Sequence, residues 1–143
     1  VKKGSTVLDI GANIGLHTTL FSRWAGPYGH VYAFEPVQDT FWQMRETMAL
    51  NRCTNVQMFQ SAIMDKPGQT IINVFDQKHS VWNTFGSHNF KGIGPVRMET
   101  VPVDSLDRFC SEHNITTIDF AKIDVEGFEK NVLRGAHKLL SEK

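Results

Sequence analysis

Short apolar runs alternate along the chain with segments in which apolar residues recur at helical spacing. Such runs, bounded by glycine, proline or acidic residues, are typical of buried strands, and their alternation with amphipathic helices predicts βαβ units. Right-handed crossovers then favour an α/β fold with a doubly wound, mostly parallel sheet and helices on both faces. We expect main strands at residues 7–10, 30–34, 56–62 and 118–123, an antiparallel segment at 70–75, and an extended segment at 97–103.

Helices are expected between these strands, with Asp39 and Asp104 as caps of the second and third and with Glu126 and Gly127 starting the last. The apolar residues at helical spacing are Leu16, Leu20, Phe21 and Trp24 in the first helix and Phe41, Met44 and Met48 in the second. These residues should form the buried faces of the two helices, and we expect Trp24 and Trp42 to pack on helix faces.

Composition restricts the class of protein. The 143 residues are enough for one domain, which we place at residues 1–143, and fifteen basic against fifteen acidic residues leave no net charge. This balance argues against a nucleic-acid surface, and no apolar run approaches the roughly 20 residues of a membrane span. Cys53 and Cys110 match no metal or redox spacing. We therefore expect a cytoplasmic protein that binds neither nucleic acid nor membrane.

The sequence VLDIGANIG at residues 7–15 combines a strand, a glycine turn and a helix start. In a doubly wound sheet, ligands bind beyond the carboxyl ends of the strands, where a helix start offers unpaired N–H groups and a positive dipole end. Asn13 and Leu16 stand where a dinucleotide fingerprint needs glycine, and no phosphate-loop lysine follows. A pyrophosphate ligand, and with it a nucleotide-dependent oxidoreductase, is therefore disfavoured.

Glu35 ends the second predicted strand, downstream of the glycine turn. A carboxylate at this position can accept hydrogen bonds from both hydroxyls of a ribose. A nucleoside held without a pyrophosphate points to S-adenosylmethionine, whose sulfonium cation suits a pocket that contains carboxylates.

The sequence KIDVEGFE at residues 122–129 contributes further charged groups to the same end of the sheet. Lys122 and Asp124 fall on one face of a strand, about 7 Å apart at ordinary strand rise. A buried lysine is costly unless it is paired, so these two residues could serve as a purely stabilising ion pair. Alternatively, Asp124 faces the cleft and takes part in chemistry.

These motifs together resemble the FkbM family of S-adenosylmethionine-dependent methyltransferases. The resemblance rests on VLDIGANIG, AFEP, NVQMFQSAI, the Asn83–Thr84–Phe85 segment, VDSLDRF and KIDVEGFEKNVLRGA, in this order over most of the chain. It implies a Rossmann-like class I fold and transfer of a methyl group to a hydroxyl oxygen of a small metabolite or saccharide.

The resemblance also implies roles for individual residues. For the cofactor, it places Asp9, Gly11, Asn13 and Gly15 around the methionine part, Glu35 and Pro36 at the ribose, and Gln60, Ser61 and Ala62 by the adenine. Asn83, Thr84, Asp124 and Glu126 would lie at the acceptor and the reacting centre, with Asp124 also beside the cofactor.

Transfer to a hydroxyl requires a base within hydrogen-bond reach of the acceptor proton. Asp124 is the first candidate, Glu126 the second and His17 the third, although His17 could instead be a helix-surface residue beside the cofactor or substrate. Lys122 is a further candidate catalytic residue. A divalent metal on Asp124 and Glu126 would be an alternative, but two carboxylates are too few ligands, and no metal is predicted.

The segment at residues 77–95 is long, polar and interspersed with Trp82, Phe85 and Phe90. Long irregular segments of this kind serve as lids or binding loops, so we expect it to close over the acceptor and the cofactor. The alternative is that its aromatic residues form a small apolar cluster on the sheet.

The sequence departs from the family pattern at its end. It stops after the helix that follows the fourth main strand, so strands five to seven of the class are expected to be absent and the domain to be truncated. Strand 118–123 would then be an exposed apolar edge, which proteins normally cover. We expect this edge to pair with a second copy as a homodimer. The alternative function is a non-catalytic cofactor-binding or assembly domain.

Overall fold

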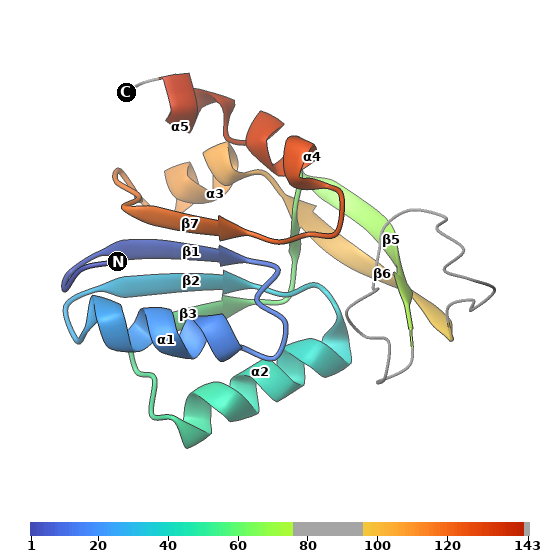
Figure 1. Cartoon of the computed structure of the whole chain (residues 1–143). Coiled ribbons are helices and arrows are strands. Elements are labelled where there is room, and N and C mark those ends of the chain that lie inside the picture. The colour runs from blue at the N-terminus through green and yellow to red at the C-terminus, as the bar shows by residue number, and fades with distance from the viewer. Residues whose placement is uncertain (76–95, 142–143) are drawn as a thin grey trace.

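The computed structural model describes residues 1–75 and 96–141, which form two sheets and five helices (Figure 1). The segment at 77–95, with Asn83 and Thr84, lies outside the described residues, so its predicted role as a lid stays a prediction. No helix within the described ranges has the length and apolar character needed to cross a membrane.

The main sheet confirms the predicted doubly wound α/β class. Its four strands are parallel and lie in the order β3-β2-β1-β7, so the chain starts at the inner strand β1, winds outward to β3, and returns to the other side of β1. The strands are β1 (Thr6–Ile10), β2 (His30–Phe34), β3 (Val56–Phe59) and β7 (Phe120–Ile123).

Helices cover both faces of this sheet (Figure 1). Successive residues of β1 show the division: Val7 packs in a cluster with Phe21 of α1, whereas Leu8 packs in a cluster with Phe109 of α3 and Val132 of α4. One face carries α1 (Leu16–Ala25) and α2 (Gln38–Leu50), and the other carries α3 (Leu106–Glu112), α4 (Glu129–Arg134) and α5 (His137–Ser141).

A second, three-stranded sheet lies beside the main sheet, and the sequence did not predict its separation. Its order is β4-β6-β5, with β5 antiparallel to β6 as expected. The predicted single strand at 56–62 is wrong, because the chain leaves the main sheet after Phe59, and Ala62 pairs with Val103 instead. The strands are β4 (Ala62–Ile63), β5 (Gly68–Val74) and β6 (Arg97–Asp104).

Several predicted helix ends are also wrong. Asp39 lies in the first turn of α2 rather than at its cap, and Ser105, not Asp104, caps α3 through its hydroxyl, which accepts the N–H of Arg108. The last helix begins at Glu129 rather than at Glu126, and it is divided into α4 and α5 at Gly135. The backbone of Gly135 lies against the carbonyl of Met64, so a larger residue at this position would collide.

The buried face of α1 is rotated from the predicted one. On α1, Trp24 is 52% exposed and Leu16 is exposed as well, so neither is a core residue. On α2, Trp42 is 48% exposed and likewise lies outside the core. The buried positions of α1 include Thr18, Phe21, Ser22 and Ala25. Thr18 and Ser22 are polar, and the hydroxyl of Thr18 bonds to the buried Asp9, so apolar spacing alone does not reveal this face.

The glycine turn after β1 is shaped by close packing between elements. Gly11 has φ +77°, and a Cβ atom there would overlap the carbonyl oxygen of Asp124. Gly15 has φ +86°, and its Cβ would lie 2.7 Å from Cε of Met48 on α2. Both glycines therefore serve contacts within the protein, which explains why this turn carries so little side chain.

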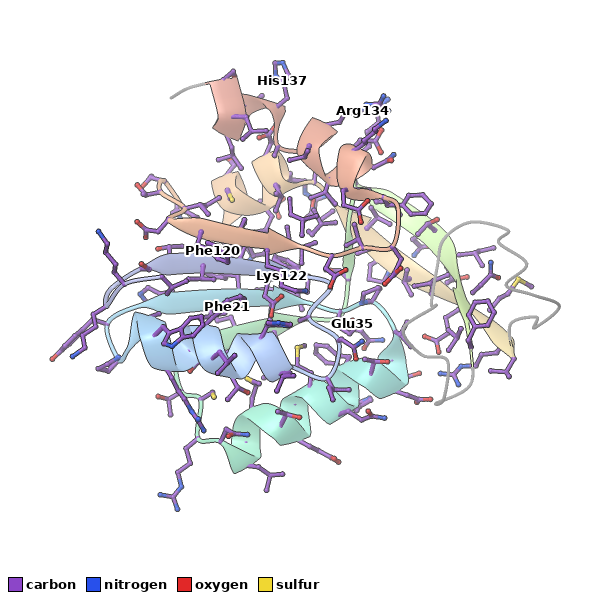
Figure 2. All side chains as sticks on the ribbon, in the orientation of Figure 1. Phe21, Glu35, Phe120, Lys122, Arg134 and His137 are labelled. Carbon is purple, nitrogen blue, oxygen red and sulfur yellow. The ribbon has the colours of Figure 1, made fainter. Side chains whose placement is uncertain are left out.

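Strand β7 forms one edge of the main sheet, and within residues 1–75 and 96–141 its outer side pairs with no strand. Phe120 on this strand is 41% exposed and packs against Phe21 of α1, with ring centroids 5.4 Å apart (Figure 2). The strand is two residues shorter than the predicted 118–123. Pairing of this edge with a second copy stays a prediction.

Replacement of Gly11 by alanine should lower the free energy of unfolding by about 3 kcal/mol or more, because a left-handed alanine is strained and the overlap with Asp124 displaces β7. Gly4→Ala is the matched control: Gly4 has φ +84° but open space around its Cβ position. This control should lose only about 1 kcal/mol. Urea denaturation measures both losses, and equal values would show that the contact with Asp124 does not constrain the turn.

Candidate active site

A cleft of about 850 Å³ opens at the carboxyl ends of β1, β2 and β7, within the size range of small-molecule sites. Its lining brings together the predicted site residues Gly11, Asn13, His17, Glu35, Pro36, Lys122, Asp124 and Glu126. The second sheet supplies a wall that the sequence did not predict, formed by Ile72 and Val74 of β5 and Arg97 of β6, with Val96 beside them.

Glu35 is the most buried carboxylate in the lining of this cleft, at 7% exposure. Its two oxygens accept the backbone N–H groups of Asn13 and Val37, each at 3.0 Å. Burial raises the pKa of Glu35 to about 7, against the lowering effects of these hydrogen bonds and of the nearby Lys122 charge. Each carboxylate oxygen has a further lone pair, so the group can accept hydrogen bonds from ligand hydroxyls.

The start of α1 lies beside Glu35 and faces the cleft. Gly15 at the N-cap provides no side-chain hydrogen bond, and Leu16 and His17 of the first turn line the cleft. Unpaired N–H groups and the positive end of the helix dipole therefore favour an acceptor-rich or anionic ligand group at this point.

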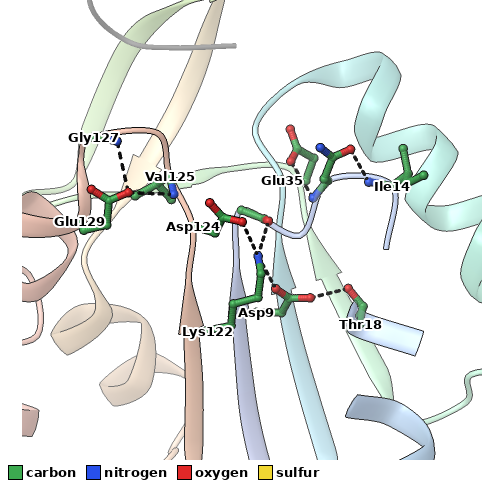
Figure 3. A network of polar contacts seen from close by, with 11 residues as sticks. Asp9, Ile14, Thr18, Glu35, Lys122, Asp124, Val125, Gly127 and Glu129 are labelled. Atoms are coloured by element: carbon green, nitrogen blue, oxygen red, sulfur yellow. Dashed lines mark hydrogen bonds and ion pairs between the residues drawn. The ribbon is translucent and has the colours of Figure 1, made fainter. Parts of the chain in front are cut away.

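Lys122 connects three groups at the junction of β1 and β7 (Figure 3). Its Nζ donates to the carbonyl oxygen of Gly11 at 3.0 Å and lies 3.4 Å from both Asp9 Oδ1 and Asp124 Oδ2. Asp9 is fully buried, and its other oxygen accepts the hydroxyl of Thr18 at 2.7 Å. Lys122 and Asp124 form the ion pair considered from the sequence, and the lysine also compensates the buried charge of Asp9. Whether the pair only stabilises the strand ends or Asp124 takes part in chemistry stays a prediction.

The turn after β7 carries Asp124 and Glu126 at the cleft. The side chain of Asp124 is 62% exposed, and Glu126 adopts a left-handed backbone with φ +48°. Partial burial raises the pKa of the Glu126 carboxyl, and the neighbouring charges of Asp124 and Glu129 act in the same direction. A raised pKa brings a carboxylate closer to the range that suits a general base.

Sequence reasoning assigned no role to Glu129, although it is the final residue of the D-V-E-G-F-E motif. Its Oε1 accepts the N–H of Val125 at 3.3 Å and that of Gly127 at 3.1 Å. The motif spacing offered a signal, because an acid at the start of a helix can reach back to the preceding turn.

Other predicted cofactor residues do not line the cleft. Asp9 lies beneath it, as the partner of Lys122 and Thr18, and Gly15 lies against α2. Ser61 and Ala62 are not among the lining residues, although Ala62 is buried in an apolar cluster with Ile72 and Val74 of the cleft wall. Within the described ranges, no group of three or more histidine, cysteine or acidic side chains is arranged to hold a metal.

A family model described as the methyltransferase FkbM domain matches residues 9–143. The chain is 29% identical to Methyltransferase 1 of Beauveria bassiana over 92% of this chain and 58% of that protein. It is 28% identical to 2-O-methyltransferase NoeI of Sinorhizobium fredii over 99% of this chain and 61% of that protein. It is also 28% identical to hexuronic acid methyltransferase AglP of Haloferax volcanii, over 89% and 48%.

The fold agrees with the crystal structure of the methyltransferase FkbM from Methylobacillus flagellatus KT. That comparison has a TM-score of 0.63 and 17% identity, and covers 99% of this chain and 32% of that chain. The three curated relatives named above are longer than this chain, which spans between 48% and 61% of their length. On the match across residues 9–143, with the cleft at the strand ends, this chain belongs to the FkbM family of methyltransferases.

Proposed function

We propose that this chain binds S-adenosylmethionine in the cleft and transfers its methyl group to a hydroxyl of a small metabolite or saccharide. The observation that carries the proposal is the position of Glu35, a buried carboxylate at the end of β2, directly beside the uncapped start of α1. This arrangement pairs an acceptor for sugar hydroxyls with a group of N–H donors.

The residues present fit the cofactor. Glu35 would accept the ribose hydroxyls, and the turn at Gly11 and Asn13 with the first turn of α1 would hold the amino-acid end. Among described residues, the two cationic side chains that line the cleft are already paired, Lys122 with Asp9 and Asp124, and Arg97 with Asp39 and Glu99. The remaining carboxylates favour a cationic ligand over a phosphorylated one.

The bound cofactor supplies an electrophilic methyl group on a sulfonium. The chain must orient the acceptor hydroxyl, exclude water and accept the proton of that hydroxyl. Asp124 stands at the strand end that faces the cleft and is the first candidate for the base, with Glu126 beside it as the second. His17, in the first turn of α1, also lines the cleft and is the third.

The relatives support an oxygen acceptor on a sugar. One is named a 2-O-methyltransferase and another a hexuronic acid methyltransferase. Since this chain spans only part of their length, the acceptor is proposed at the level of a hydroxyl compound, and the sugar itself is left open.

Glu35→Ala should weaken S-adenosylmethionine binding by about tenfold or more, because a charged hydrogen-bond acceptor is lost from a buried position. Isothermal titration calorimetry measures the affinity. Glu46→Ala, on the exposed side of α2, is the control and should bind as the wild type does. A wild type that binds neither S-adenosylmethionine nor S-adenosylhomocysteine would contradict the proposed function.

The affinity for S-adenosylhomocysteine should increase about tenfold from about pH 6 to about pH 8, because ligand hydroxyls favour the charged form of a carboxylate whose unliganded pKa is near 7. The higher affinity is therefore present above the pKa that Glu35 has in the unliganded protein, and it is lost as the pH falls through that value. Glu35→Gln, which cannot titrate, should lack this increment, while protonation of the ligand's own amino group affects both proteins equally. Parallel pH profiles of the two proteins would argue against contact between the ligand and Glu35.

Asp124→Asn should leave cofactor affinity within about threefold of wild type, because asparagine keeps the shape of the side chain. It should lower methyl transfer by about 100-fold or more if Asp124 accepts the acceptor proton. Transfer of labelled methyl groups to a panel of mono- and disaccharides measures the rate, and Glu126→Gln tests the second candidate in the same assay. Unchanged transfer in Asp124→Asn would exclude Asp124 as the base, and binding without transfer by the wild type would support a non-catalytic domain.

A further inference from the structure

The turn that connects β7 to α4 presents two carboxylates to the cleft and is held by a third. Asp124 and Glu126 line the cleft, whereas Glu129 contacts the backbone of the turn that carries them (Figure 3). One oxygen of Glu129 accepts two N–H groups, those of Val125 and Gly127. The bonds therefore lie on either side of Glu126 in the chain.

This turn needs support because of its backbone conformation. Glu126 has φ +48° and Gly127 has φ +94°, so two successive residues are left-handed. For a residue with a long side chain such as Glu126, this conformation costs roughly 1–2 kcal/mol. Backbone hydrogen bonds, including one from its own N–H, also lower the pKa of Glu129, which keeps the acceptor charged.

We propose that Glu129 is a positioning residue of the cleft, whose carboxylate fixes the left-handed turn that presents Asp124 and Glu126 to the ligand. Glu129 does not line the cleft itself and acts through the backbone. The inference depends on the proposed function only for the identity of the ligand, because the contacts of Glu129 exist without it.

Amide hydrogen exchange of the unliganded chain, followed by NMR, tests the contact. Glu129→Ala should accelerate exchange of the Val125 and Gly127 amides by about tenfold or more. Glu129→Gln keeps a side-chain carbonyl as acceptor and should restore most of the protection. Glu112→Ala, which removes an exposed acid of α3, is the matched control and should leave both amides unchanged. Equal exchange in the wild type and in Glu129→Ala would overturn the proposal.

Calorimetry with S-adenosylhomocysteine tests whether the turn matters for the cleft. Glu129→Ala should weaken binding by about fivefold or more, with recovery in Glu129→Gln to within about twofold of wild type. Wild-type affinity in Glu129→Ala would overturn the positioning role even if exchange is accelerated. If the wild type itself does not bind, the proposed function fails, and the exchange comparison alone decides whether Glu129 holds the turn.

Discussion

The ammonium group of Lys122 joins the parts of the molecule on which the cleft depends. It lies between the buried carboxylate of Asp9 on β1 and the exposed carboxylate of Asp124 at the end of β7, and it donates to the carbonyl of Gly11 in the glycine turn. A fully buried carboxylate without a counter-charge would be strongly destabilising. Because one cation contacts all three groups, strand pairing, turn geometry and the position of Asp124 are coupled.

The charge that the cleft presents to a ligand depends on which of its charged side chains are already paired. Lys122 and Arg97 each contact two acids, so the described lining offers its carboxylates to a ligand more readily than its cations. Glu35 is the extreme case, since desolvation holds its pKa near neutrality while two backbone N–H groups orient both of its oxygens. Such a group is ready to receive hydroxyl donors without rearrangement.

Local patterns were sufficient to predict the main sheet and much of the cleft. The apolar runs identified the parallel strands, and the ends of those strands identified Gly11, Glu35 and Asp124 as neighbours, because the carboxyl ends of parallel strands meet at one edge. Most features that the sequence did not predict depend on contacts between residues that are far apart along the chain. The separate sheet of β4, β5 and β6 and the burial of Thr18 in place of Trp24 are set by tertiary packing rather than by spacing along the chain. The backbone contacts of Glu129, by contrast, reach only two and four residues back along the chain, so their signal was present in the sequence.

The central claim is that an adenosine-based sulfonium ligand occupies the space between the end of β2 and the start of α1. A crystal structure of this chain soaked with S-adenosylhomocysteine tests it most directly. The account predicts both ribose hydroxyls within hydrogen-bond distance of the Glu35 carboxylate and the amino-acid end against the turn at Gly11. Density for the ligand at any other surface, with the strand-end cleft closed by protein side chains, would contradict the account.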